Sequence, residues 1–372
     1  MRFTIVTHVP HIIQGNSFFA YAPYVREMNL WIQYVDEVII VAPIESNEVT
    51  AIHEAYIHSN IKLIPLKSFD FLTVTSSFKA VPSIFRNIYL IYKAFKNTDH
   101  IHLRCPGNIG MLGAIVQVLF PKINKTAKYA GNWDPNAIQP LSYRFQKKLV
   151  SSLFWAKKMK VLVYGDWENQ TSNVLPFFTA TYSEIEKKEL LYKTNQERID
   201  FLFVGTLSIG KQPLYAIQLV EALKNREVNV LLSIYGDGAE KESLMAYIHK
   251  FELESIVSLK GNANKKVLKE VYQKSHFLIL PSKSEGWPKV IAEAMFWGCL
   301  PIATPVSCVA SMLDHGNRGV LLSADIHKDV EKIKELIDDT ALFQYKRNLA
   351  MEWSRTYTID TFEIEINKLL NR

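Results

Sequence analysis

The sequence is poor in cysteine, and its few cysteines are not spaced for metal binding. It contains three, Cys105, Cys299 and Cys308, an odd number with no C-x-x-C pair. This pattern indicates neither a disulfide framework nor a zinc site. A reducing, cytoplasmic location is therefore expected.

Long apolar runs and biased segments are also missing. The longest nearly uncharged run, residues 106–121, is shorter than the roughly 20 residues that a helix needs to cross a bilayer. Residues 1–7 lead directly into a strand and do not resemble the apolar segment of a signal peptide. Without proline-, glycine- or serine-rich stretches, the whole chain is expected to fold.

Acidic residues are scarce in the first half of the chain. Of the 372 residues, those numbered 1–180 include 18 Lys and Arg against 11 Asp and Glu, whereas the rest include 25 against 26. The net charge of +6 thus arises in the first half, which is expected to face an anionic partner. Because no nucleic-acid-binding motif accompanies this mild excess, nucleic acid is not expected to be that partner.

Short β-rich segments alternate with helical ones, and the series occurs twice. The first series is residues 3–7, 38–41, 61–65, 100–103, 128–130 and 161–164, and the second is 201–205, 230–235, 257–259, 277–281, 302–304 and 319–322. Apolar strands separated by helices predict parallel sheets covered on both faces.

The predicted fold class is therefore α/β, with two doubly wound Rossmann-like domains facing one another across a cleft. We expect an N-terminal domain at residues 1–177, with a linker near Pro176, and a C-terminal domain at 178–357. A closing helix at about 358–372 is expected to pack back on the first domain.

The segment 281–295 carries the sharpest local signal. It follows a strand and predicts a helix from about Pro288 to Trp297, because proline suits a first helical turn and Gly298 suits the position after the last one. The free N–H groups and dipole of such a helix form a site for phosphate.

Two glutamates, Glu285 and Glu293, flank the start of this helix. Eight helical residues rise about 12 Å, which exceeds the roughly 5 to 9.5 Å between the paired carboxylates of glycosidases. The spacing suits two contacts on an extended ligand, such as the sugar and ribose ends of a nucleotide sugar. The alternative is a solvated Glu285 and a helix-surface Glu293.

A second loop favours the ligand interpretation. Lys211 precedes Pro213 at the expected start of another helix, where a cation can meet a diphosphate. A lone lysine there is usually solvated, so the argument depends on both loops lying in one domain. The glycines of Tyr235-Gly236-Asp237-Gly238 predict a plain turn.

Glu285 and Glu293, followed by Ala294, Met295 and Gly298, resemble the E-x7-E signature of the retaining glycosyltransferases of family four, which have the GT-B fold. The resemblance implies that Glu285 contacts the donor sugar near its reacting carbon and that Glu293 holds the ribose hydroxyls. It implies that Lys211 binds the diphosphate. It also places further positions at the donor: Gly15, Asn262, Ala263, and the main chain of Gly286, Trp287, Pro288, Lys289 and Val290.

The sequence departs from the family pattern at two places. Thr206 stands where the family commonly has a second diphosphate cation, an arginine, and Lys289 or Arg104 is a candidate replacement. Arg104 aligns with a family histidine beside the reacting carbon, with His102 two residues earlier. Glu285, Lys211 and Arg104 are thus the predicted catalytic residues.

The acceptor is expected at the N-terminal domain, near His102, Arg104 and the other polar residues that follow its strands, namely Asn108, Asn132, Trp133 and Asp134. Trp133 suits either stacking on a sugar or burial in the core. Residues 143–163 mix aromatic residues with lysines, and predict an amphipathic helix that either lies on an anionic membrane or has a solvated basic face.

The expected function is transfer of a hexose from a nucleotide-diphosphate sugar to a glycan or lipid-linked acceptor. A UDP-sugar is favoured over GDP-mannose because it is commoner in the family. Without a D-x-D motif, neither a metal nor another cofactor is expected. Two alternatives are a nucleotide-sugar epimerase or hydrolase on the same fold, and a non-catalytic sugar-nucleotide sensor.

Overall fold

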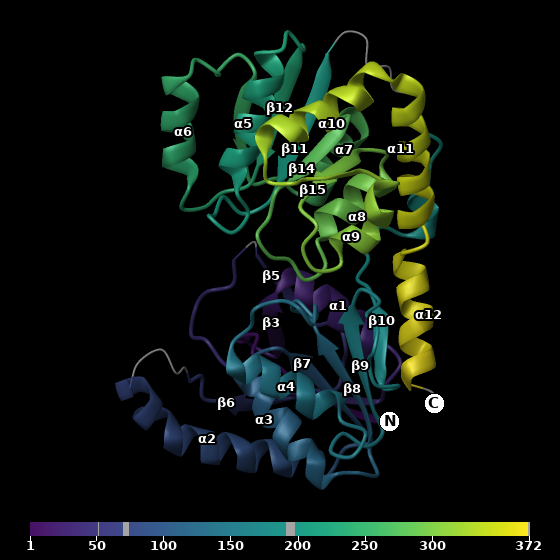
Figure 1. Ribbon diagram of the computed structural model, residues 1–372. Helices are drawn as coiled ribbons and strands as arrows, with labels where there is room; N and C mark the ends of the chain where they lie inside the picture. The colour runs from purple at the N-terminus through teal and green to yellow at the C-terminus, as the bar shows by residue number, and fades with distance from the viewer. Residues whose placement is uncertain (51, 70–73, 191–197, 371–372) are drawn as a thin grey trace. The chain divides into compact units, whose positions relative to one another are not determined.

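The chain folds into two compact units. The computed structural model describes residues 1–50, 52–69, 74–190 and 198–370 (Figure 1). Unit 1 comprises Met1–Phe178 and Phe362–Arg372, and unit 2 comprises Thr179–Thr361. The polypeptide therefore passes between the units twice.

Unit 1 is built on a seven-stranded parallel sheet with the order β10-β9-β8-β7-β1-β4-β6. Its strands, in chain order, are β1 (Arg2–Val6), β4 (Glu37–Pro43), β6 (Ile61–Leu66), β7 (His100–Cys105), β8 (Asn124–Tyr129), β9 (Met159–Tyr164) and β10 (Val174–Phe177). The order reverses between β1 and β7, so the sheet is doubly wound.

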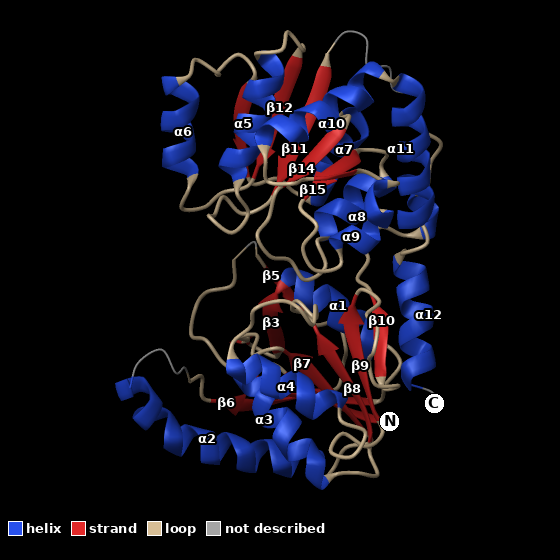
Figure 2. Ribbon diagram, in the orientation of Figure 1, coloured by secondary structure: helices blue, strands red, loops and turns tan. Residues whose placement is uncertain are grey.

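Helices cover this sheet, and a small antiparallel sheet is added to it (Figure 2). The helices are α1 (Ala22–Ile32), α2 (Val74–Phe95), α3 (Asn108–Val116), α4 (Leu141–Ser151) and the greater part of α12 (Ile359–Leu370). The small sheet consists of β2 (Ile12–Gln14), β3 (Ser17–Tyr21) and β5 (His53–Ala55). Helices α2, α3 and α4 pack successively against one another. Their apolar faces bury a core that includes Ile91, Phe95 and Leu112.

Unit 2 repeats the design with a six-stranded parallel sheet, ordered β13-β12-β11-β14-β15-β16. The strands are β11 (Ile199–Val204), β12 (Val230–Tyr235), β13 (Val257–Gly261), β14 (Phe277–Leu280), β15 (Leu300–Ala303) and β16 (Val320–Leu321). The helices are α5 (Pro213–Lys224), α6 (Lys241–Lys250), α7 (Lys265–Lys274), α8 (Lys289–Phe296), α9 (Val309–Met312), α10 (Ile326–Asp338) and α11 (Thr340–Ser354). Stacked rings of Phe201 and Phe277, 5.3 Å apart, lie in its core.

The structure corrects three details of the sequence prediction. Pro176, expected in a linker, lies in the edge strand β10, where its missing N–H removes no bond from the middle of the sheet. The small sheet β2-β3-β5 was not predicted, because its strands are only three to five residues long. The helix expected within residues 143–163 is found only as far as Ser151, where α4 ends, and β9 begins at Met159.

The last helix, α12, contributes its aromatic residue Phe362 to unit 1. The ring of Phe362 lies 5.4 Å from that of Phe177 and 5.5 Å from that of Phe178. The buried ammonium of Lys128 lies 4.4 Å from the ring of Phe177 and donates a 2.8 Å hydrogen bond to the carbonyl of Phe178. These contacts attach the C-terminal helix to the end of β10.

Candidate functional site

The topology of unit 2 fixes where its ligand site should lie. The strand order reverses between β11 and β14, which are hydrogen-bonded neighbours. In open α/β sheets ligands bind beyond the carboxyl ends of the strands at such a reversal, because the following helices leave a crevice there. In this unit, that place is formed by the loop after β11, residues 205–212, and the loop after β14, residues 281–288.

The two loops are joined by main-chain and side-chain contacts. The N–H of Lys283 donates to the carbonyl of Gly210 at 2.8 Å. The ammonium of Lys211 forms an ion pair with the carboxylate of Glu285. The Glu285 side chain is only 8% exposed, against 31% for Lys211. The lysine is thus the member of the pair that solvent, or a ligand, can reach.

Local backbone geometry places Lys211. Its N–H donates to the carbonyl of Ser208 at 2.9 Å, which closes a turn immediately before helix α5. Gln212 then adopts a left-handed conformation with φ of 51°, and Pro213 begins the helix. The ammonium therefore extends from the N-terminus of α5, where the positive end of the helix dipole also favours an anion.

The glycines of the β12 turn permit the loops to approach closely. A Cβ on Gly236 would lie 1.8 Å from the carbonyl oxygen of Gly205, and one on Gly238 would lie 2.4 Å from that of Leu207. The Leu207 N–H also donates to the carbonyl of Asp237 at 3.0 Å. The sequence predicted a plain turn here, but these glycines support the loop that carries Thr206 and Lys211.

The next loop along this edge follows β13. Gly261 has a φ of +70°, and its carbonyl accepts the N–H of Gly236 at 2.9 Å. Asn262 and Ala263 come directly after it, and the side chain of Asn264 caps helix α7 by accepting the N–H of Val267. The positions expected beside the nucleotide base thus lie at the same edge of the sheet as Lys211.

Side chains from the segment after β15 hold the loop after β14 in place. The carbonyl of Gly286 accepts a hydrogen bond from the Ser307 hydroxyl at 3.3 Å and one from the Cys308 thiol at 3.1 Å. Burial raises the pKa of Cys308 to about 12, so this thiol stays protonated and can donate. Ser307 and Cys308 were not predicted to hold this loop, because no motif or spacing in the sequence marks them.

Aromatic packing fixes the other end of the loop. The ring of Trp287 stacks on that of Trp353 at 6.2 Å and meets the ring of Tyr357 edge-on at 5.6 Å. Pro288 then caps α8, which begins at Lys289 and ends before Gly298, close to the predicted bounds. The first turn of α8, with Lys289 and Val290, therefore starts from a loop whose conformation is fixed.

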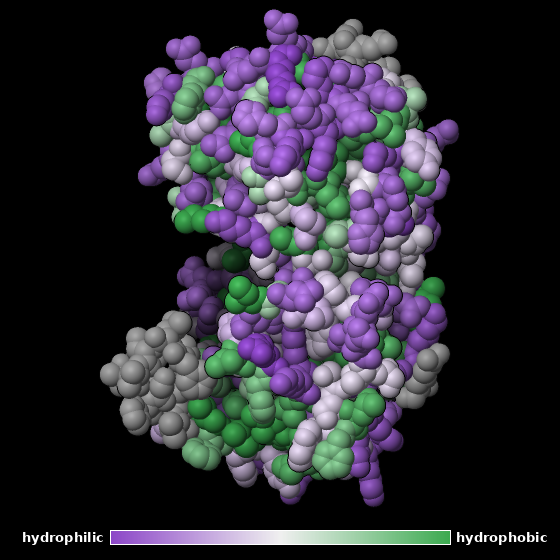
Figure 3. Space-filling view, viewed as in Figure 1, coloured by the Kyte–Doolittle hydropathy of each residue, from purple (hydrophilic) through white to green (hydrophobic). Residues whose placement is uncertain are grey.

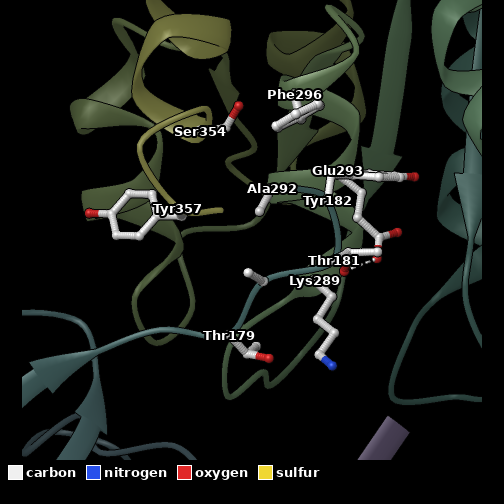
Figure 4. Close-up of a pocket in the computed structure, with 10 residues that line it drawn as sticks. Thr179, Thr181, Tyr182, Lys289, Ala292, Glu293, Phe296, Ser354 and Tyr357 are labelled. Atoms are coloured by element: carbon white, nitrogen blue, oxygen red, sulfur yellow. Dashed lines mark hydrogen bonds between the residues drawn. The ribbon is translucent and has the colours of Figure 1, made fainter. Parts of the chain in front are cut away.

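Glu293 lies one turn further along α8. Its carboxylate accepts hydrogen bonds from the hydroxyls of Thr181, at 2.7 Å, and Tyr272, at 3.2 Å. Figure 4 shows the Thr181 bond inside a small hollow that Lys289 and Tyr357 also line. Glu293 is thus half-buried and held by neutral donors, whereas Glu285 is held by a cation.

The strand order of unit 1 also reverses, between β1 and β7, and Arg104 lies near the end of β7. Its guanidinium donates to the carboxylate of Glu27 on α1 at 2.9 Å, and the two side chains are 14% and 5% exposed. The guanidinium also lies 5.6 Å from the ring centre of Tyr24. Glu27 was not predicted from the sequence, because it lies far from Arg104 along the chain.

Two residues expected at the acceptor are in the core of unit 1. His102 is fully buried. Its Nδ1 shares a 2.8 Å hydrogen bond with the Thr126 hydroxyl, and its ring centre lies 4.6 Å from that of Trp31. Burial lowers the pKa of His102 to about 3. Trp133 is also buried and donates from its indole to Gln170 at 2.9 Å. Neither side chain is open to a ligand in this structure, which corrects the expected position of His102 and, of the two possibilities for Trp133, favours burial in the core.

The other predicted positions in unit 1 lie outside the core. The side chain of Asn108 donates to the carbonyl of Phe69 at 3.1 Å. Asn132 and Asp134 each accept the N–H two residues further on, at 2.8 Å, and so shape the turn after β8. Gly15 lies at the tip of the β2-β3 hairpin with φ of +59° and open space around its Cα.

Among residues 1–50, 52–69, 74–190 and 198–370, no group of three or more His, Cys, Asp or Glu side chains is arranged to hold a metal ion. Within those same ranges, no helix is both long and apolar enough to cross a membrane.

Comparison with solved structures defines the class of fold. A glycosyltransferase from Rickettsia africae matches with a TM-score of 0.69 at 14% identity, covering 100% of this chain and 99% of that one. HepE from Anabaena, solved in complex with UDP and glucose, matches with a TM-score of 0.64 at 15% identity, over 100% and 99%. The predicted α/β class, with two Rossmann-like domains of the GT-B type, is confirmed.

Comparison with sequences then gives the particular family of domain. Residues 184–354 match the family described as Glycosyl transferases group 1, so unit 2 contains a domain of that type. An uncharacterized glycosyltransferase of Methanocaldococcus jannaschii is 28% identical over 185 residues, which are 49% of this chain and 50% of that protein. The aligned stretch spans about half the length of the curated relatives that the chain matches.

Proposed function

We propose that the protein is a retaining glycosyltransferase, which moves a hexose from a nucleoside-diphosphate sugar to a glycan or lipid-linked acceptor. The observation that carries the proposal is the Lys211–Glu285 ion pair at the strand reversal of unit 2. It places an exposed cation, which a diphosphate can reach, directly beside a carboxylate that is largely covered in this structure. The match of residues 184–354 to a glycosyltransferase domain supports this assignment.

The donor is proposed to bind along the carboxyl edge of the sheet. Lys211 and the N–H groups at the start of α8 would meet the diphosphate, and Glu293 would take the ribose hydroxyls in place of Thr181 or Tyr272. Asn262 and Ala263 would border the base. We favour UDP as the nucleotide, and HepE, a protein of the same fold, was solved with UDP and glucose.

In the proposed reaction, the bond between the sugar C1 and the diphosphate oxygen breaks, and both electrons leave with the diphosphate. The acceptor hydroxyl oxygen bonds to C1 on the same face, and its proton passes to the departing diphosphate. The barrier falls because the ammonium and N–H groups are already oriented toward the developing negative charge. With these donors, we propose that neither a metal nor another cofactor is required.

Arg104 is proposed to act at the acceptor side, together with Asn108, Asn132 and Asp134. Because Glu27 already holds its guanidinium at 2.9 Å, Arg104 presents a fixed charge and needs no reordering to meet an acceptor oxygen. His102 and Trp133 are left out of this proposal, since both are buried.

The proposal is tested with a panel of nucleotide sugars. UDP and one UDP-sugar should raise the melting temperature, because a ligand at 100 times its Kd stabilises the folded state by about 2.7 kcal/mol. That sugar should then appear on an acceptor, at the same rate with EDTA present, and with its anomeric configuration retained by NMR.

Other outcomes separate the alternatives. Stabilisation by GDP-mannose alone would show that the donor is GDP-mannose and not a UDP-sugar. Loss of activity in EDTA would contradict the metal-free mechanism. Free sugar or an epimer without any glycan product would identify a hydrolase or an epimerase. Binding without any turnover of donor would identify a sensor.

A further inference from the structure

One part of unit 1 has almost no negative charge. Residues 100–165 include ten Lys and Arg but one acidic residue, Asp134. This stretch runs from β7 through α3 and α4 to the end of β9. Such an imbalance over 66 residues leaves its lysines without acidic neighbours in sequence, and favours an anionic partner.

The same stretch exposes a group of large apolar side chains, which we call the apolar patch. Its members are Ile115, Leu119, Leu153, Phe154 and Trp155. Phe154 is 68% exposed and Trp155 is 53% exposed, with their rings edge-to-face at 4.9 Å. Figure 3 shows hydrophobic side chains gathered over α3 and α4 on this part of unit 1.

The backbone beneath the apolar patch is held in place. In the turn after α4, the Trp155 N–H donates to the Ser152 hydroxyl at 3.2 Å, and the Ala156 N–H donates to the Ser152 carbonyl at 2.9 Å. The Trp155 carbonyl accepts the side-chain amide of Gln117 at 3.2 Å. This last bond ties the turn to the segment where α3 ends and a short 3-10 turn, Gln117–Leu119, follows, and this segment carries Ile115 and Leu119. The apolar side chains therefore project from a fixed surface.

Lysines border the apolar patch. The ammonium of Lys157 lies 5.8 Å from the centre of the Phe154 ring. The main-chain carbonyl of Lys157 accepts a hydrogen bond from the ammonium of Lys125 at 2.7 Å. Lys122, Lys148 and Lys158 are exposed close by in the chain. Long lysine stems can lie along an apolar surface while the charged heads reach outward. The surface thus combines an apolar centre with a basic border.

This combination distinguishes between the possible partners. A nucleic acid would satisfy the lysines but would leave exposed Leu119, Leu153 and Ile115 with nothing apolar to contact. The boundary between lipid headgroups and acyl chains takes both kinds of side chain, with aromatic residues favoured there and lysines meeting anionic headgroups. Charge and apolarity together therefore favour a lipid surface.

We propose that the apolar patch and its bordering lysines dock unit 1 on an anionic membrane surface, without crossing it. The sequence suggested a basic amphipathic helix for this role, whereas the structure assigns it to the turn after α4 and to the segment from the end of α3 to Leu119. The docking itself does not depend on the proposed function. Only one part of the proposal rests on the proposed function, namely that the acceptor is a lipid-linked glycan.

Vesicle co-sedimentation of the full chain tests the proposal without any sugar donor. Wild-type protein should bind vesicles of phosphatidylcholine with one quarter phosphatidylglycerol, and bind phosphatidylcholine alone at least tenfold less. Each basic residue near an anionic leaflet strengthens partitioning by roughly a factor of five. Lys157→Glu with Lys158→Glu should thus lower binding at least tenfold, and so should Phe154→Ser with Trp155→Ser.

Matched changes in unit 2 provide the control. Met245→Ser removes an exposed apolar side chain and Lys266→Glu reverses an exposed charge, both outside the apolar patch, so binding should stay at the wild-type level. Unchanged melting temperatures would show that the patch variants still fold. All of these measurements remain valid even if no sugar is transferred.

The proposal is overturned if wild-type protein binds neither kind of vesicle, or if the patch variants bind as well as wild type. It is also overturned if the patch variants instead dissolve a dimer in solution, since the patch would then be a contact between protein copies. RNA binding that depends on Lys157 and Lys158 but not on Phe154, without vesicle binding, would equally contradict it.

Discussion

The two units share a doubly wound sheet, but their candidate sites are made in different ways. In unit 2, main-chain hydrogen bonds join the loops, and glycines allow them to touch, as Gly236 does at Gly205. In unit 1, the corresponding place is occupied by a side-chain pair, Arg104 with Glu27, above buried histidines. A site built from backbone can be recognised in the sequence by the spacing of its glycines and prolines. A pair of side chains that are far apart in the chain gives no such pattern.

The largest expected difference between the units is their response to acid. His11, His100 and His102 all lie in unit 1, and burial lowers their pKa values to about 4, about 4 and about 3. The unfolded chain, with histidine pKa values of about 6.5, takes up these protons first as the pH falls. The free energy of unfolding of unit 1 should therefore drop below pH 6.5, by up to about 4 kcal/mol per pH unit.

Calorimetry between pH 7.5 and 5 checks this expectation, with unit 1 melting earlier as the pH falls. His100→Gln should flatten the dependence, because glutamine can still bond to the Thr126 hydroxyl that His100 contacts at 3.0 Å. The exposed His249→Gln serves as the control. Stability that is equal at pH 7 and pH 5 would mean that these histidines are not held neutral by burial.

The next effect concerns the carboxylate of unit 2. Glu285→Gln keeps the shape of the side chain but removes the charge that pairs with Lys211, so kcat should fall roughly 100- to 1,000-fold, as for the loss of other groups that act in the transition state. Steady-state kinetics measures this, and Glu270→Gln on the exposed side of α7 is the control. A kcat within threefold of wild type would remove Glu285 from the reaction.

The smallest expected effect is on nucleotide binding. Lys211→Ala should weaken the Kd for UDP by about tenfold, since a hydrogen bond to a charged group contributes about 1.5 kcal/mol or more. Titration calorimetry measures it, with Lys266→Ala as the control. Because the change also leaves Glu285 unpaired, the double variant Lys211→Ala with Glu285→Gln is needed, and it should bind equally weakly. Wild-type affinity in both would contradict the assigned role of Lys211.

Features that depend on local backbone geometry could be predicted from the sequence, whereas the burial of individual side chains could not. The start of α8 at Lys289 and the turn before α5 were predictable, because Pro213, Pro288 and Gly298 act through their own backbone geometry. His102 was misplaced because a predicted strand does not say what covers each of its faces, and in the structure Trp31 on α1 packs against this histidine. Trp133 looked suitable for stacking, since a residue after a strand carries no sign of how deeply it is buried.

By itself the sequence determined the alternation of strands and helices, the doubled architecture, and the loop and helix that carry Glu285 and Glu293. These depend on short-range properties, namely apolar runs, proline and glycine positions, and helix termini. Only the tertiary structure decided that Glu27 holds Arg104, that Thr181 and Tyr272 hold Glu293, and that Phe154 and Trp155 lie on the surface. Such contacts join residues that are distant in sequence, and their energy exists only once the unit that contains them has folded.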